Sequence, residues 1–211
     1  CLWASPVSGD REFHPYQPIT AAMLDPVLPI KGPTGSGSCF CIRADIAVTA
    51  AHIVDGNEPL EVHMPMGSHK GSAWIGAKVL YQDKMRDIAF VRLEKPYGHV
   101  ARVGNDADTR IGDAVIVIGF PVSALAPVAS LGFLSSKASD PNITSDSTKW
   151  ISSNAIYFGN SGGPVYDART GRVIGILCEG VGQGMNGIAP NVAIFAGATE
   201  LRKAMKKAGV D

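Results

Sequence analysis

The sequence predicts an all-β fold that ends in one α-helix. Short runs of β-branched and other apolar residues follow one another along most of the chain, and Gly, Pro, Asn or Asp bounds each run, which is typical of strands in a β-sandwich or β-barrel. Helical periodicity is almost absent before the C-terminal segment. With 211 residues, 45% of them hydrophobic, the chain can form one substantial domain or two small barrels that share an interface.

The first segment, residues 1–33, is predicted to be an extended arm. Prolines recur through it and disfavour a packed element. The chain begins with Cys1 rather than Met, and its start lacks the basic and then apolar layout of a signal peptide. We therefore expect a processed product or a part of a longer protein, and the sequence assigns no compartment. No apolar run approaches the roughly 20 residues of a membrane-spanning helix.

The segments after the arm are predicted to supply the strands and then the helix. The apolar runs lie at residues 38–51, 60–64, 73–82, 87–94, 113–120, 129–136, 149–156, 172–179 and 191–196. In the tail, the apolar positions at helical spacing are Leu201, Ala204, Met205 and Ala208. Thr199 is the candidate N-cap. Basic residues occupy the other face of this helix, which we expect to be solvated rather than to bind nucleic acid.

Overall charge and cysteine content exclude several classes of protein. Lys plus Arg equals Asp plus Glu at 19 each, so net charge favours neither nucleic acid nor an anionic membrane as a partner. Cys39 and Cys41 are two residues apart on a predicted strand, where their side chains lie too far apart to bond readily. We expect these cysteines to be small buried apolar residues, and we expect the protein to bind no metal and no cofactor. Four of the five histidines are predicted to lie at the surface: His14, His63, His69 and His99.

Three residues in separate motifs point to nucleophilic catalysis. Ser161 lies in "YFGNSGGPV", His52 ends the apolar run "VTAAHIV", and Asp87 begins "DIAFVRL". A serine hydroxyl attacks a carbonyl well only when an imidazole takes its proton and a carboxylate holds that imidazole in one tautomer. Each residue alone has a plain structural explanation, as a turn serine, a surface or core histidine, or a turn aspartate. Together they follow one known chain order of a catalytic triad.

These motifs resemble those of trypsin-like (chymotrypsin-fold) serine proteases, and most closely the HtrA/Deg branch. The resemblance also includes "IGDAVIVIGFP" and "GRVIGI", and it covers roughly residues 34–210. It implies two Greek-key six-stranded β-barrels with a cleft between them. The expected domain, residues 34–211, would hold an N-terminal barrel at about 34–110, a C-terminal barrel at about 111–197 and a terminal helix at about 199–208.

The resemblance also assigns an oxyanion hole to the backbone N–H groups of Gly159 and Ser161. Glycine at 159 permits a backbone conformation that a Cβ would make costly. Many digestive relatives carry an aspartate before the nucleophile, where it pairs with a newly cut N-terminus, but this chain carries Asn160. We therefore expect any activity to be independent of that zymogen switch.

The resemblance assigns a substrate site around the same turn. Ala155 would form the floor of the pocket for the residue before the scissile bond, with Ile156 beside it. Gly180 and Gly187 would form the walls of this pocket. Such an apolar floor offers no counter-ion for Lys or Arg, so small or medium aliphatic residues should be preferred. The strand at Cys178 and Glu179 would pair with the substrate backbone.

The sequence thus predicts a serine endopeptidase that acts on peptides or proteins. One alternative is a polyprotein-processing protease of viral type, and another is a non-catalytic, peptide-binding member of the fold. Esterase chemistry on a nucleophile elbow is disfavoured, because the chain lacks the strand-elbow-helix context and the Ser, Asp, His order of that fold. Homo-oligomers or a missing partner domain fit the family.

Overall fold

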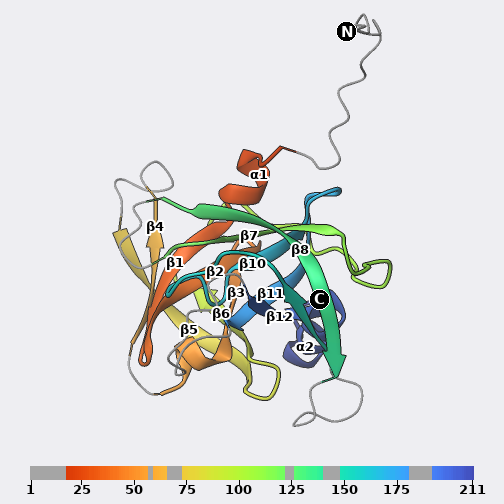
Figure 1. Cartoon of the computed structure of the whole chain (residues 1–211). Coiled ribbons are helices and arrows are strands. Elements are labelled where there is room, and N and C mark those ends of the chain that lie inside the picture. Colours follow the sequence, from red (N-terminus) through yellow and green to blue (C-terminus); the bar gives the residue numbers. More distant parts are fainter. Residues whose placement is uncertain (1–17, 57–58, 66–72, 122–125, 140–147, 181–191) are drawn as a thin grey trace, which may run out of the picture.

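The protein is described by a computed structural model that places residues 18–56, 59–65, 73–121, 126–139, 148–180 and 192–211. These residues form two closed antiparallel barrels of six strands each, with the C-terminal helix against the second barrel (Figure 1). The predicted all-β class, the two barrels and the terminal helix are confirmed.

The first barrel has the strand order β1-β2-β3-β6-β5-β4. Its strands are β1 (Val27–Gly32), β2 (Gly35–Arg43), β3 (Ile46–Thr49), β4 (Leu60–Met64), β5 (Ala73–Asp83) and β6 (Ile88–Leu93). A 3-10 turn, η1 (Ala51–Val54), follows β3. Antiparallel pairing of β3 with β6 brings the end of β3 beside the start of β6, where Thr49 lies opposite Ala89. The segments that carry His52 and Asp87 therefore meet at one end of this barrel.

The second barrel has the strand order β10-β11-β12-β9-β8-β7. Its strands are β7 (Ala114–Gly119), β8 (Val128–Ser139), β9 (Thr148–Ser152), β10 (Pro164–Asp167), β11 (Arg172–Gly180) and β12 (Ala193–Gly197). The turn with Ser161 connects β9 to β10. The sequence analysis did not predict β10, because its short run follows directly on the glycine-rich turn.

Part of the predicted arm is ordered structure instead. Residues 21–24 form the short helix α1 (Ala21–Leu24), and residues 27–32 form β1 of the first barrel. Pro29 misled the prediction, since proline lacks the N–H that a central strand needs. The structure accommodates it because β1 pairs with β4 only at Ile30 and Lys31. Residues 1–17 lie outside the described part of the chain.

The C-terminal helix α2 (Ala198–Ala208) matches the prediction to within one residue. Its apolar side packs on the second barrel, and the stripe includes the buried residues Leu201 and Ala204. Thr199 was predicted to be the N-cap, but Gly197 occupies that position. The backbone N–H and the hydroxyl of Thr199 instead donate to Oδ1 of Asp106, at 2.9 and 2.5 Å, so a carboxylate from the linker between the barrels caps the helix.

Three apolar clusters hold the fold together. One fills each barrel, and the third lies between the barrels and under α2. Cys39 and Cys41 are buried free thiols in the first barrel, as predicted. Burial raises the pKa of Cys41 to about 12 and raises that of Cys39 well above its ordinary value, so both stay protonated. Among the described residues, no helix has the length and apolar character needed to cross a membrane.

Candidate active site

His52 lies in the 3-10 turn η1, directly after β3. The hydroxyl of Thr34 donates to the backbone oxygen of His52, and Nε2 of Gln82 donates to the backbone oxygen of Ala51 at 3.0 Å. These bonds anchor the turn from β5 and from the loop between β1 and β2. The imidazole itself is 47% exposed, so one side of the ring is open to solvent.

Asp87 lies at the end of the tight turn between β5 and β6, and it binds His52 twice. Its Oδ1 accepts the backbone N–H of His52 at 2.8 Å, and its Oδ2 lies 2.8 Å from Nδ1 of the ring. The side chain of Asp87 is 18% exposed. A carboxylate accepts only, so Nδ1 carries the proton and Nε2 keeps a free lone pair.

This pairing changes the basicity of His52. The hydrogen bond that the ring donates to Asp87 raises the pKa of the imidazole, burial lowers it, and the charges of Asp87 and Glu179 raise it. The net effect is a pKa above the ordinary value. The arrangement is that of a general base held in one tautomer.

Ser161 lies on a turn that is fixed by contacts to both barrels. Ser38 of β2 donates its backbone N–H to the oxygen of Ser161 at 2.8 Å, and Gly162 donates to Leu177 of β11 at 2.7 Å. Gly162 has φ +85, and a Cβ there would overlap the backbone oxygen of Ser38 and lie 2.8 Å from the backbone nitrogen of Ala50. Only glycine fits at this position. The close approach places the turn beside Ala50, which precedes His52 by two residues in the chain.

The structure thus brings His52, Asp87 and the Ser161 turn to the same place between the barrels. In the described part of the chain, Ser161 and His52 are not hydrogen-bonded to each other. Catalytic hydrogen bonds in ligand-free enzymes are often long and tighten only when substrate binds. The absence of this bond is therefore compatible with catalytic roles for both residues.

Two backbone N–H groups at the serine turn are candidate oxyanion donors. Gly159 has φ +96, the left-handed region that favours glycine, and its N–H group makes no hydrogen bond within the described structure. The same holds for the N–H of Ser161. By contrast, the intervening Asn160 N–H donates to the oxygen of Tyr157 at 3.1 Å. Two unpaired N–H groups, one on the nucleophile and one two residues before it, can stabilise an oxyanion.

Ser38 is a polar contact of this turn that the sequence analysis missed. It is fully buried, and its hydroxyl donates to the backbone oxygen of Gly159 at 2.7 Å and accepts the N–H of Phe120 at 2.8 Å. It thereby fixes the peptide between the two candidate oxyanion donors. Nothing in "GSGSCF" distinguishes Ser38 from Ser36, so only the fold shows this role.

Asn160 is 3% exposed, and its side-chain oxygen has no hydrogen-bond partner within the described structure. A charged aspartate at this position would be an unpaired buried carboxylate, which costs far more than an unpaired amide oxygen. The neutral side chain is consistent with a site that needs no N-terminal amine beside it.

The predicted substrate residues are placed only in part. Ala155 and Ile156 are half-buried on the segment between β9 and Ser161, and Ile156 packs against the core of the second barrel. Gly180 ends β11. Gly187 lies outside the described residues, so of the two predicted pocket walls the structure describes only the one at Gly180.

Cys178 and Glu179 lie on β11, as predicted. A register shift between Leu177 and Glu179 buries Cys178 as well as Leu177 and leaves Glu179 exposed. Burial raises the pKa of Cys178 to about 12, so this thiol is not a nucleophile at neutral pH. Glu179 lies 3.4 Å from Nζ of Lys149 on β9.

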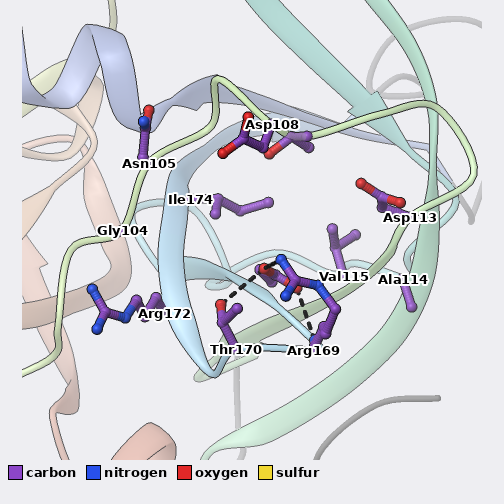
Figure 2. Close-up of a pocket in the computed structure, with 12 residues that line it drawn as sticks. Gly104, Asn105, Asp108, Asp113, Ala114, Val115, Arg169, Thr170, Arg172 and Ile174 are labelled. Atoms are coloured by element: carbon purple, nitrogen blue, oxygen red, sulfur yellow. Dashed lines mark hydrogen bonds and ion pairs between the residues drawn. The ribbon is translucent and has the colours of Figure 1, made fainter.

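A separate polar cavity of about 200 Å³ lies on the second barrel, and none of the candidate catalytic residues lines it (Figure 2). Asp108, Asp113 and Arg169 face it. Within its wall, Asp167 accepts from Thr170 at 2.8 Å and lies 3.5 Å from Arg169. These bonds close the turn between β10 and β11, so a structural role accounts for Asp167, Arg169 and Thr170.

Comparison with known proteins identifies the family. The model of the trypsin-like peptidase domain matches residues 37–176. The chain belongs to the trypsin-like peptidase family. Among curated relatives, this trypsin-like domain is 36% identical over 150 residues to serine protease HhoA of Synechocystis sp., and 33% identical over 165 residues to mitochondrial serine protease HTRA2 of Bos taurus. The predicted HtrA/Deg branch is confirmed.

These alignments cover 67% and 75% of the trypsin-like chain but only 36% and 34% of the two relatives. The chain thus spans about a third of the length of these curated relatives. Among solved structures, the HtrA-type protease AlgW with a decapeptide superposes with a TM-score of 0.73 at 18% identity, covering 89% of this chain and 66% of that chain. The active form of the M. tuberculosis protease Rv3671c gives 0.72 at 22% identity, covering 90% and 84%. Both show the same fold.

Proposed function

We propose that this chain is the protease domain of an HtrA-type serine endopeptidase. The observation that carries the proposal is the double hydrogen bond between Asp87 and His52, next to a serine turn with two unpaired N–H groups. A peptide-binding module needs neither an oriented base nor free backbone donors. Family membership supports the same conclusion, because the curated relatives are named serine proteases.

In this proposal Oγ of Ser161 attacks the peptide carbonyl while Nε2 of His52 takes its proton. The new negative charge on the carbonyl oxygen is held by the N–H groups of Gly159 and Ser161. His52 then gives the proton to the leaving amine, the C–N bond breaks, and an acyl-enzyme remains. Water hydrolyses this ester with His52 again as the base. Asp87 stabilises the imidazolium in each step without itself becoming protonated.

Substrate recognition is proposed to follow the side chains around the turn. Ala155 and Ile156 offer apolar surface to the residue before the scissile bond, and burial of a charged side chain there would lack a counter-ion. Tyr157 and Phe158, directly before Gly159, are 64% and 66% exposed and add apolar surface at the rim. The edge of β11 at Glu179 and Gly180 would pair with the substrate backbone. The HtrA-type structures with a decapeptide and a tripeptide support a peptide ligand.

The proposal is tested with a fluorophosphonate probe and a peptide panel. We expect one adduct on the intact protein, mapped to Ser161. Peptides with Ala, Val or Leu before the scissile bond should then be cleaved with a kcat/KM about 10²-fold above that of Lys or Asp peptides. A wild-type protein that gains no adduct and cleaves no peptide would favour the non-catalytic member of the fold. Preference for Lys would contradict the assigned pocket.

Ser38→Ala tests the oxyanion hole. The change leaves the buried oxygen of Gly159 and the N–H of Phe120 without their partner and frees the peptide between the two donors. We expect the rate of probe labelling to fall about 10-fold to 100-fold, because a displaced N–H donor no longer stabilises the negative charge that develops in the reaction. The control is Ser135→Ala, which removes an exposed hydroxyl that donates to Phe133. Equal labelling rates for both variants would contradict the role of Ser38.

A further inference from the structure

The backbone of Asp87 is held in the left-handed region, which residues other than glycine adopt rarely. Its φ of +57 is the only positive φ of a non-glycine residue within the described structure. Such a conformation persists only where the surroundings impose it. The two bonds to His52 hold the carboxylate, but they do not fix the backbone of the turn that precedes it.

The preceding residue, Arg86, supplies that constraint. Its backbone N–H donates to Oδ1 of Asp83 at 3.0 Å, and its NH1 lies 3.1 Å from Oδ2 of the same carboxylate. The guanidinium is 11% exposed. Because one carboxylate binds both the backbone and the side chain of Arg86, rotation of the guanidinium is coupled to the turn that ends at Asp87.

The second anchor of Arg86 comes from the other end of the chain. Nε of Arg86 lies 2.6 Å from Oε2 of Glu200, in the first turn of α2 and 114 residues away. Glu200 is 3% exposed, and its other oxygen lies 3.1 Å from Nζ of Lys203. A buried carboxylate is stable only when it is paired, so α2 and the turn before Asp87 hold each other in place.

We propose that Glu200 and Arg86 are positioning residues that fix Asp87, and through it His52, from the C-terminal helix. The inference rests on the proposed protease function. It assigns to α2 a role in ordering the site from a position that touches no substrate. Displacement of α2 would then lower kcat by displacing Asp87 and His52, without a change in any residue that binds substrate.

Glu200→Gln tests the inference, with Arg202→Gln as the matched control. The glutamine keeps the size of the side chain but removes the charge that binds Arg86. Arg202 lies on the same helix and anchors it through hydrogen bonds to the backbone oxygens of Gly104 and Val103. We expect Glu200→Gln to lower kcat about 10-fold to 100-fold with KM within about twofold, since small displacements of catalytic groups have effects of this size. Arg202→Gln should change kcat less than about twofold at a comparable melting temperature.

A second readout does not depend on activity. The carboxylates that raise the pKa of His52 are those of Asp87 and Glu179, so we expect the loss of the Glu200 carboxylate to act on this pKa through Asp87. In NMR titrations we expect the His52 pKa to fall in Glu200→Gln and to stay at the wild-type value in Arg202→Gln. If Glu200→Gln does not fold, Arg86→Lys, which keeps the charge but loses the guanidinium geometry, is measured in the same way.

The outcomes separate the two proposals. A wild-type protein that reacts with no fluorophosphonate overturns the protease function, and the titration of His52 still decides whether Glu200 positions Asp87. A Glu200→Gln variant with wild-type kcat and an unchanged His52 pKa overturns the positioning role. Equal losses of kcat in Glu200→Gln and Arg202→Gln also overturn it, because they would reflect general loosening of the helix.

Discussion

Ser161→Ala is expected to lower kcat by about 10⁶-fold and to abolish the fluorophosphonate adduct. The attacking oxygen is removed, and no other described side chain near His52 can replace it. Cys178 is the nearest alternative on β11, but its buried thiol is protonated at neutral pH because burial raises its pKa to about 12. Activity measured on purified protein, with intact mass after probe treatment, checks both expectations.

The fold of this variant should be unchanged. The hydroxyl of Ser161 makes no hydrogen bond within the described structure, so its loss leaves no buried partner unsatisfied. We expect the free energy of unfolding to change by less than about 0.5 kcal/mol. Ser153→Ala, which removes a hydroxyl that accepts the N–H of Phe133 in the same barrel, serves as the control and should keep full activity. An adduct that persists on Ser161→Ala would assign the nucleophile elsewhere.

Much of the fold could be predicted from the sequence, because short local patterns of residues indicate most of the strands. Short β-branched or apolar runs with Gly, Pro, Asn or Asp at their ends located most of the strands, and the apolar spacing of the tail located α2. The error at β1 has a physical origin. Pro29 disfavours a strand locally, but the barrel supplies a position in β1 where the missing N–H meets no partner strand, and such pairing is not visible in the sequence.

The candidate site was predictable only where its chemistry depends on residue type. Histidine, aspartate and a serine among glycines form a recognisable order, so His52, Asp87 and Ser161 could be proposed from sequence motifs. Ser38 and Glu200 could not. Their side chains act through contacts to residues more than 100 positions away, 121 for Ser38 with Gly159 and 114 for Glu200 with Arg86. No local pattern indicates such a contact.

Asp87→Asn is expected to lower kcat by about 10⁴-fold while the fold stays intact. Oδ1 of Asp87 accepts the backbone N–H of His52, so the amide oxygen of asparagine must take this position to avoid placing two donors together. The amide NH₂ then faces Nδ1 of the ring. Nδ1 must accept, the proton moves to Nε2, and His52 can no longer take a proton from Ser161.

The matched control is Asp55→Asn. Asp55 follows the same 3-10 turn and pairs with Lys84 at 2.6 Å, but both side chains are largely exposed and neither contacts His52. Loss of such a surface pair has little effect, so kcat should stay within about twofold of the wild type. Equal losses in the two variants would indicate that removal of either carboxylate disturbs the turn, which contradicts a specific role for Asp87.

The pH dependence gives an independent check on the same residue. Only neutral His52 acts as a base, so kcat/KM of the wild type should rise with pH through the pKa of His52, which the hydrogen bond to Asp87 places above its ordinary value. Asp87→Asn removes both this hydrogen bond and the carboxylate charge, while burial still lowers the pKa of the ring. The rise of the residual activity should therefore move to lower pH, and NMR titration of His52 should show the same shift. An asparagine variant that loses activity but titrates like the wild type would mean that the carboxylate acts on substrate rather than through His52.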